Sequence, residues 1–341
     1  MDLSAAAPRA EAIAAFLDRA GWADAEQAPL AGDASNRRYL RLRKGSETAV
    51  LMDARPERGE DVRPFLAVTA LLRARGLSAP EIRLADEATG LLLLEDLGDA
   101  LYARQCAADP TAEGALYGAA VDLLAEQAAP APALAPYDAA VLKREARLAV
   151  DWYHAGLVET PGALGEALSA HLAEALAPVA ACRAVLVLRD YHAENLLWLP
   201  GRRGHARVGL LDYQDALAGH PAYDLVSLLE DARRDTAPEL RAAMLARYLA
   251  ARPDVDEAAF RAAYAALGAQ RNLKIIGIFA RLARRDHKPR YLALIPRVWA
   301  HLMGDLAHPE LSALKDLVRR HLPPPDSAAL ARLARPIEGH G

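Results

Sequence analysis

The chain has few of the residues that mark several specialised protein classes. Only 2 of its 341 residues are cysteine. Cys106 and Cys182 form no spaced metal motif and indicate no disulfide framework, so we interpret both as small apolar core residues in a reducing compartment. No apolar run reaches the roughly 18 residues that a membrane span needs. The N-terminus lacks a basic segment leading into an apolar one, so we predict no signal peptide and expect a cytoplasmic protein.

Neither sign of charge is in large excess. The formal net charge is −4, with acidic and basic residues mixed along the chain. This distribution does not mark a nucleic-acid-binding or membrane-surface protein. No obligatory protein partner is evident either. The length, with 53% hydrophobic residues, predicts a globular protein of two domains or lobes, each with its own core.

A short polar stretch followed by two strand-like runs is the most informative pattern in the chain. Asp190 is suited to accept a hydroxyl proton, and Asn195, five residues later, offers an amide oxygen to Mg²⁺. The runs 195–200 and 207–212 flank a Gly/Arg turn and predict a β-hairpin. Because a hairpin brings its outer ends together, Asn195 and the Asp212 carboxylate would share one metal ion. The pattern therefore predicts phosphoryl transfer from ATP with Mg²⁺.

The same polar residues also have a simpler explanation. An Asp followed by Asn at this spacing occurs by chance in many proteins, and both residue types are common in turns and helix caps. His192 either orients Asp190, contacts the substrate or packs within the loop. Asp215 is either a carboxylate behind the metal or a surface turn residue. The hairpin that returns Asp212 to Asn195 favours the catalytic interpretation.

Other segments extend this pattern over most of the chain. They are Gly32–Tyr39, Val50–Asp53, Leu93–Gly98, Asp190–Asn195, Leu211–Ala216, Pro221–Leu225 and Gln270–Phe279. Together they resemble the aminoglycoside phosphotransferase-like (choline-kinase-like) small-molecule kinases, a branch of the protein-kinase fold. More narrowly, they are similar to the anomeric kinases of cell-wall sugar recycling, which phosphorylate C1 of N-acetylmuramate and N-acetylglucosamine.

The resemblance implies a fold, an activity and a partner. The fold is expected to be α+β and bilobal, with a small antiparallel β-sheet lobe at 1–97 and a larger, mainly helical lobe at 98–341. The expected activity is an ATP- and Mg²⁺-dependent sugar 1-kinase of peptidoglycan recycling, whose partner is a small-molecule amino-sugar acceptor. Two alternatives stay open: a kinase of another small acceptor, such as an aminoglycoside or a choline-like compound, and a silent nucleotide-binding pseudokinase.

Two segments are candidates for nucleotide binding. The small and polar residues of 32–38 suit a loop whose backbone N–H groups close over phosphates. The segment 95–98 is the natural hinge between lobes, where adenine would meet backbone groups. The candidate nucleotide-binding residues are Asp33, Ser35, Asn36, Arg37, Glu95 and Leu97. Arg37 and Arg38 should lie on opposite faces of the following strand, so at most one points towards the nucleotide.

The chain departs from the kinase pattern at three places. The strand lysine that binds the α- and β-phosphates would fall at Met52, and the helix expected at 63–75 contains no acidic residue to pair with it. Losing both partners together is physically coherent, since a lone buried charge is costly. The histidine expected two residues before Asp190 is replaced by Leu188. These departures favour a silent nucleotide-binding pseudokinase, whereas the retained Asp190, Asn195 and Asp212 favour an active kinase.

The C-terminal part of the resemblance contributes candidates for acceptor binding. Arg271 and Lys274 stand on a predicted helix and would meet a lactyl carboxylate or an acetamido group. The alternative is a solvated helix face. By resemblance, Asp224 is structural and ties the catalytic loop through hydrogen bonds.

Periodicity and turn residues predict the surrounding elements. Strand-like runs are 37–43, 48–53, 81–86 and 90–95. Helical runs are 8–20, 63–75, 111–128, 139–155, 163–181, 222–234, 237–250, 256–285, 288–303 and 308–321. The last dozen residues are expected to be loose.

Overall fold

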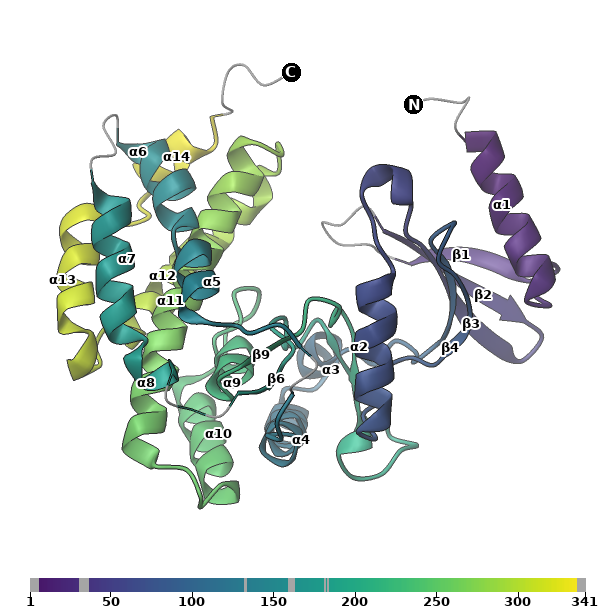
Figure 1. Cartoon of the computed structure of the whole chain (residues 1–341), viewed down its shortest axis with the longest axis horizontal. Helices are drawn as coiled ribbons and strands as arrows, with labels where there is room; N and C mark the ends of the chain where they lie inside the picture. The colour runs from purple at the N-terminus through teal and green to yellow at the C-terminus, as the bar shows by residue number, and fades with distance from the viewer. Residues whose placement is uncertain are drawn as a thin grey trace. The chain divides into compact units, whose positions relative to one another are not determined.

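The computed structural model describes residues 6–30, 37–131, 134–158, 163–180, 182 and 184–335 (Figure 1). The chain divides into two compact units. The first comprises Met1–Ala108 and Glu194–Asp215, and the second comprises Asp109–Ala193 and Ala216–Gly341. The segment that contains the predicted hairpin thus belongs with the sheet, although the sequence analysis grouped everything beyond residue 97 with the helices.

A five-stranded antiparallel sheet forms the centre of the first unit, with strand order β1-β2-β3-β5-β4. The strands are β1 (Glu26–Leu30), β2 (Arg38–Lys44), β3 (Glu47–Asp53), β4 (Ile82–Asp86) and β5 (Leu91–Glu95). Four of them confirm predicted runs. The edge strand β1 was missed because its sequence, Glu-Gln-Ala-Pro-Leu, is mostly exposed and lacks apolar alternation.

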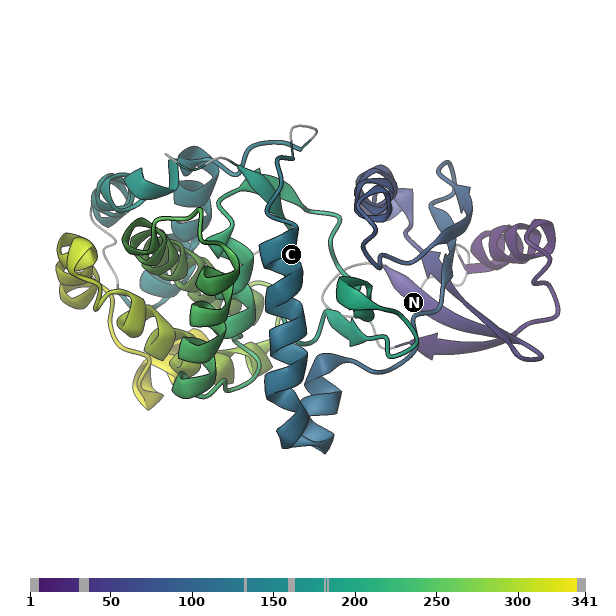
Figure 2. The same ribbon diagram turned by 90° about the horizontal axis from the view of Figure 1, so that it is seen from below.

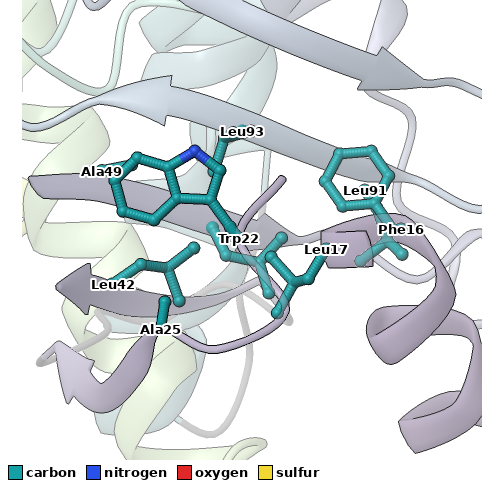
Figure 3. Packing of buried hydrophobic residues seen from close by; sticks show 9 residues of the cluster. Phe16, Leu17, Trp22, Ala25, Leu42, Ala49, Leu91 and Leu93 are labelled. Carbon is teal, nitrogen blue, oxygen red and sulfur yellow. The ribbon is translucent and has the colours of Figure 1, made fainter. Parts of the chain in front are cut away.

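One face of this sheet packs against α1 (Ala6–Arg19), confirming the predicted leading helix. Phe16 and Leu17 of α1, with Trp22 just after it, cover apolar side chains of the strands, including Leu42 and Leu93 (Figure 3). The helix α2 (Arg63–Ala74) lies on the other side of the sheet (Figure 1).

The hairpin of β7 (Leu196–Trp198) and β8 (Val208–Leu210) confirms the predicted pairing of these runs. Its backbone is tied to the rest of the first unit, which explains where the hairpin belongs. The Leu210 N–H donates to Ser78 O at 3.0 Å, and the Trp198 N–H donates to Ala100 O at 2.8 Å. The short helix α3 (Tyr102–Ala108) follows β5 in this unit and was not predicted.

The second unit is mainly helical (Figure 2). Its helices are α4 (Glu113–Glu126), α5 (Ala139–Ala146), a π-helical segment (Ala149–His154), α6 (Ala155–Leu157), α7 (Leu164–Ala175), α8 (Ala177–Ala180), α9 (Ala222–Leu229), α10 (Pro238–Ala251), α11 (Glu257–Arg284), α12 (Ile295–Asp305), α13 (Ser312–His321) and α14 (Ser327–Leu333). The short strands β6 (Val185–Val187) and β9 (Leu217–Gly219) pair antiparallel. Short 3₁₀ segments occupy Pro56–Arg58 and Gly204–Arg207 in the first unit, and Pro110–Ala112, Pro289–Leu294 and Pro309–Leu311 in the second.

The long helix α11 is the centre of this unit and packs against α5, α9, α12 and the π-helical segment. Its middle is buried because small residues let neighbouring backbones approach. At Gly277 an added Cβ would lie 2.2 Å from the carbonyl carbon of Leu148, so only glycine fits there. Far apart in the sequence, α7 and α13 lie side by side (Figure 1).

Several expectations for the helical part were wrong in detail. The run 222–234 is helical only to Leu229, and 139–155 is interrupted by the π-helical segment. The last dozen residues, expected to be loose, include the end of α14, which extends to Leu333. Cys106 is a buried core residue, as predicted, but Cys182 is exposed. Among the residues that the structure describes, every helix is too short or too polar to cross a lipid bilayer.

Candidate active site

The loop after β6 carries Asp190 and is held by a buried carboxylate from α9. Asp224 accepts hydrogen bonds from the backbone N–H groups of Leu188 (2.6 Å) and Arg189 (2.8 Å). Arg189 adopts a left-handed conformation, with φ of 71°, directly before Asp190. Burial raises the pKa of Asp224 to about 7, and the two N–H donors act in the opposite direction. Asp224 therefore has the structural role that the resemblance implied.

Arg271 of α11 is linked to the Asp190 loop through Ser227. Its side chain is buried, so the solvated-face alternative is wrong for this residue. The guanidinium Nη2 donates to Ser227 Oγ at 2.9 Å, and Ser227 Oγ donates to Arg189 O at 3.0 Å. A helix and a loop that are distant in sequence are thus joined through one hydroxyl group.

A network of charges surrounds the residue before Asp190. Arg189 Nη2 and Lys274 Nζ lie 2.5 and 3.1 Å from the carboxylate of Glu145. The Arg189 guanidinium also lies over the ring of Tyr137, 5.3 Å from its centroid. Burial acts to lower the pKa of Arg189, but its partners hold that pKa above the ordinary value, so it stays charged. Lys274 is only 14% exposed and is not on a solvated face.

His192 lies inside the second unit. The side chain is 3% exposed, and its Nε2 lies 3.3 Å from Arg233 Nη1. Burial lowers the pKa of His192 to about 3, with Asp231 acting in the opposite direction, so the ring is neutral at neutral pH. A neutral packed imidazole orders the loop without adding charge beside Asp190. Contact of His192 with a substrate stays a prediction.

In the first unit, the hairpin brings the segments of Asn195 and Asp212 together. The Leu211 N–H donates to Asn195 O at 2.9 Å, so the two predicted metal ligands leave adjacent strands. Asp212 adopts a left-handed conformation, with φ of 53°, and accepts from Gln214 Nε2 at 2.9 Å. Asp215 follows in the same segment with an exposed side chain. Carboxylate and amide oxygens are suitable ligands for Mg²⁺.

The residue after Asp212 is fixed to α2. Tyr213 is buried, its hydroxyl group lies 2.7 Å from Thr69 Oγ1, and its ring stacks on Phe65 with centroids 5.2 Å apart. These contacts set the position from which Asp212 extends. The sequence pattern did not reveal these contacts, because Thr69 and Phe65 lie far from Tyr213 in sequence.

The predicted nucleotide-binding residues are only partly described. Asp33, Ser35 and Asn36 lie outside the described residues. Arg37 pairs with Glu60, and Glu95 pairs with Arg202 at 2.5 Å, while Leu97 is partly buried. Glu60, Tyr39 and Glu145 join the candidates only through the structure. Glu60 and Glu145 are distant in sequence from their partners Arg37 and Arg189, so no local spacing marks them, whereas Tyr39 stands two residues after Arg37.

By residue type, each unit carries side chains of the kinds that phosphoryl transfer uses. Asp190 belongs to the second unit, whereas Asn195 and Asp212 belong to the first. A comparison with family models matches residues 26–262 to the phosphotransferase enzyme family. The chain belongs to this family.

Curated relatives of this phosphotransferase cover almost its whole length. It is 45% identical to the N-acetylmuramate/N-acetylglucosamine kinase of Caulobacter vibrioides, over 92% of this chain and 97% of that protein. A kinase of the same name from Pseudomonas aeruginosa is 39% identical, over 87% of this chain and 90% of that protein. The resemblance inferred from the sequence motifs is confirmed.

A solved structure shows the fold of this phosphotransferase. The choline kinase LicA of Streptococcus pneumoniae superposes with a TM-score of 0.60 at 13% sequence identity, covering 86% of this chain and 98% of that one. The predicted α+β fold class, with a small antiparallel sheet and a larger helical part, is confirmed.

Proposed function

We propose that this phosphotransferase transfers the γ-phosphoryl group of ATP to the anomeric hydroxyl group of N-acetylmuramate and/or N-acetylglucosamine. The observation that carries the proposal is the 45% identity, over 92% of this chain, to a curated kinase of that name. The retained Asp190, Asn195 and Asp212 support an active enzyme over a silent nucleotide-binding protein.

In the proposed reaction Asp190 is the base. Its carboxylate accepts the proton of the C1 hydroxyl group, that oxygen bonds to the γ-phosphorus, and the bond to the β-phosphate oxygen breaks to release ADP. An anomeric hydroxyl group is more acidic than an ordinary alcohol, so a carboxylate is a sufficient base. Arg189, held by Asp224 and Glu145, fixes the backbone from which Asp190 extends.

Asn195 and Asp212 would hold Mg²⁺ in this proposal. Among the described residues, no group of three or more His, Cys, Asp or Glu side chains is placed to hold a metal ion. Phosphoryl-transfer enzymes commonly bind Mg²⁺ through one or two protein ligands plus substrate phosphates, so a pair of oxygen ligands fits this use. Bound Mg²⁺ would neutralise part of the triphosphate charge.

Arg271 and Lys274 are proposed to influence the acceptor through the catalytic loop. The first bonds Ser227 and the second pairs with Glu145, so both support the loop from α11. We also propose that the enzyme works in the cytoplasm, where ATP is present, and feeds recycled wall sugars towards nucleotide-linked precursors.

The test is a panel of acceptors assayed for ATP- and Mg²⁺-dependent ADP release. The panel contains N-acetylmuramate, N-acetylglucosamine, glucose, choline and kanamycin. Turnover confined to the N-acetyl sugars is the expected result. Turnover of choline or kanamycin alone would show that the protein is a kinase but not a sugar kinase. ATP binding without ADP release in the presence of any acceptor would favour a silent nucleotide-binding protein.

A further inference from the structure

The sheet face that carries Met52 has no lysine at the position where kinases bind phosphate. Met52 pairs directly with Tyr39 on β2 and with Leu92 on β5, so these three side chains share one face. Met52 is 1% exposed, and α2 offers no acidic partner for a cation. A triphosphate nevertheless needs positive charge near its α- and β-phosphates. Mg²⁺ and backbone N–H groups would meet part of this need, and a cationic side chain on this face would meet the rest.

Arg37 stands on the same face, at the approach to β2. It precedes Tyr39 by two residues, and side chains alternate between faces in extended chain. Its Nε lies 2.8 Å from Glu60 Oε2, and both side chains are only 13% exposed. Glu60 comes shortly before α2. The cation–carboxylate pair absent from β3 and α2 therefore has a counterpart at the start of β2 and the loop before α2.

Arg38 is a natural contrast to Arg37. It pairs with Asp53 in the ladder of β2 and β3, so it projects from the opposite face, and its side chain is exposed. Of the two adjacent arginines, the structure places only Arg37 on the Met52 face.

A shared neighbour links Arg37 to Asp212. The Tyr39 hydroxyl group hydrogen-bonds to Arg37 and interacts electrostatically with both the Arg37 cation and the Asp212 carboxylate. Arg37 lies in the part of the first unit from which Asp212 would hold Mg²⁺ on the triphosphate.

We propose that Arg37, positioned by Glu60, takes the place of the missing strand lysine and binds the α- and β-phosphates of ATP. Glu60 engages Nε, and the terminal Nη groups of the guanidinium fork would bind phosphate oxygens. Burial acts to lower the pKa of Arg37, but Glu60 and Tyr39 hold it above the ordinary value, so the cation persists. The inference rests on the proposed function only in taking ATP as the phosphoryl donor.

The test compares the affinities of ATP and adenosine by isothermal titration calorimetry, with Mg²⁺ present and no acceptor. Arg37→Met should weaken ATP binding about 10–100-fold, the range for a lost charge-assisted hydrogen bond, and leave adenosine binding unchanged. Arg38→Met, one residue away on the other face, should change neither affinity. Arg37→Lys should restore part of the ATP affinity, because it restores the charge without the fork.

The positioning role of Glu60 has its own readout. Glu60→Gln should raise the KM for ATP while leaving the KM for the sugar and the thermal midpoint near their wild-type values. Equal weakening of ATP and adenosine by Arg37→Met, no weakening of either, or an ATP-specific loss in Arg38→Met would overturn the assignment. Because the titrations contain no acceptor, a wrong sugar assignment would leave their outcome unchanged.

Discussion

Two residues next to the proposed chemistry, Arg189 and Asp212, hold left-handed backbone conformations. Non-glycine residues adopt this region at a cost of order 1–3 kcal/mol, so the surroundings must stabilise it. Asp224 does so for Arg189 through its two backbone hydrogen bonds. Gln214 and the hairpin do so for Asp212. The hydrogen bonds that hold these two conformations also fix the backbone from which Asp190 and Asp212 extend.

The substitution Asp190→Asn tests the proposed base. It keeps the size and polarity of the side chain and removes only the proton acceptor. We expect kcat to fall about 10²–10⁴-fold, the usual contribution of a general base, with an unchanged thermal midpoint. Steady-state kinetics beside a thermal melt provides the measurement. A kcat close to the wild-type value would show that Asp190 is not the general base.

At the residue scale, the sequence predicted correctly those neighbours that the spacing within one hairpin brings together. The pairing of Leu196 with Leu210 brings the segments of Asn195 and Asp212 together as expected. Prediction from sequence failed for Glu60 and Glu145, whose partners Arg37 and Arg189 lie 23 and 44 residues away. Long-range ion pairs leave no periodic signal, so only the fold reveals them.

At the scale of elements, close packing around α11 decides whether a substitution raises or lowers the free energy of unfolding. Gly277→Ala improves helix propensity by about 1 kcal/mol. The added Cβ, however, would lie 2.2–2.5 Å from backbone atoms of Leu148 and Ala149, which cannot move independently. We expect a net loss of about 1–3 kcal/mol in the free energy of unfolding, measured by chemical denaturation.

Gly304→Ala on α12 is the matched control, because nothing lies within 4 Å of its added Cβ. Its stability should be unchanged or slightly higher. Equal effects of the two substitutions would show that the approach of α11 to the π-helical segment does not limit stability.

Element prediction failed mainly for short or polar segments. The strands β6 and β9 have three residues each, too few for a two-residue alternation to be visible. The edge strand β1 contains Pro29 and mostly exposed side chains. The longer amphipathic helix α2 was predicted within a residue at each end, because its apolar periodicity extends over several turns.

At the scale of the whole molecule, a buried acid pair should make stability depend on pH. Glu230 and Asp305 are both buried, and Asn272 Nδ2 donates to each, at 2.8 and 2.9 Å. Burial raises the pKa of both carboxyl groups above their ordinary values. The unfolded chain loses these protons first as pH rises above about 4, so the pair lowers stability as pH increases towards the folded pKa.

Asp305→Asn removes one titrating group and keeps an oxygen to accept from Asn272. The free energy of unfolding of the variant, minus that of the wild type, should therefore increase between pH 5 and pH 8. Buried histidines such as His192 and His301 have lowered pKa values and act with the opposite sign, but they are common to both proteins and cancel in the difference. A difference that stays flat with pH would show that the pair does not retain a proton in the folded state.

The position of the phosphate on the product tests the central claim most directly. The protein would be incubated with ATP, Mg²⁺ and N-acetylmuramate, and the product would be examined by proton–phosphorus correlation NMR. The sugar 1-kinase account predicts a phosphorus signal correlated with the anomeric proton. Correlation with the C6 protons, or an unmodified sugar under conditions in which another acceptor consumes ATP, would contradict it.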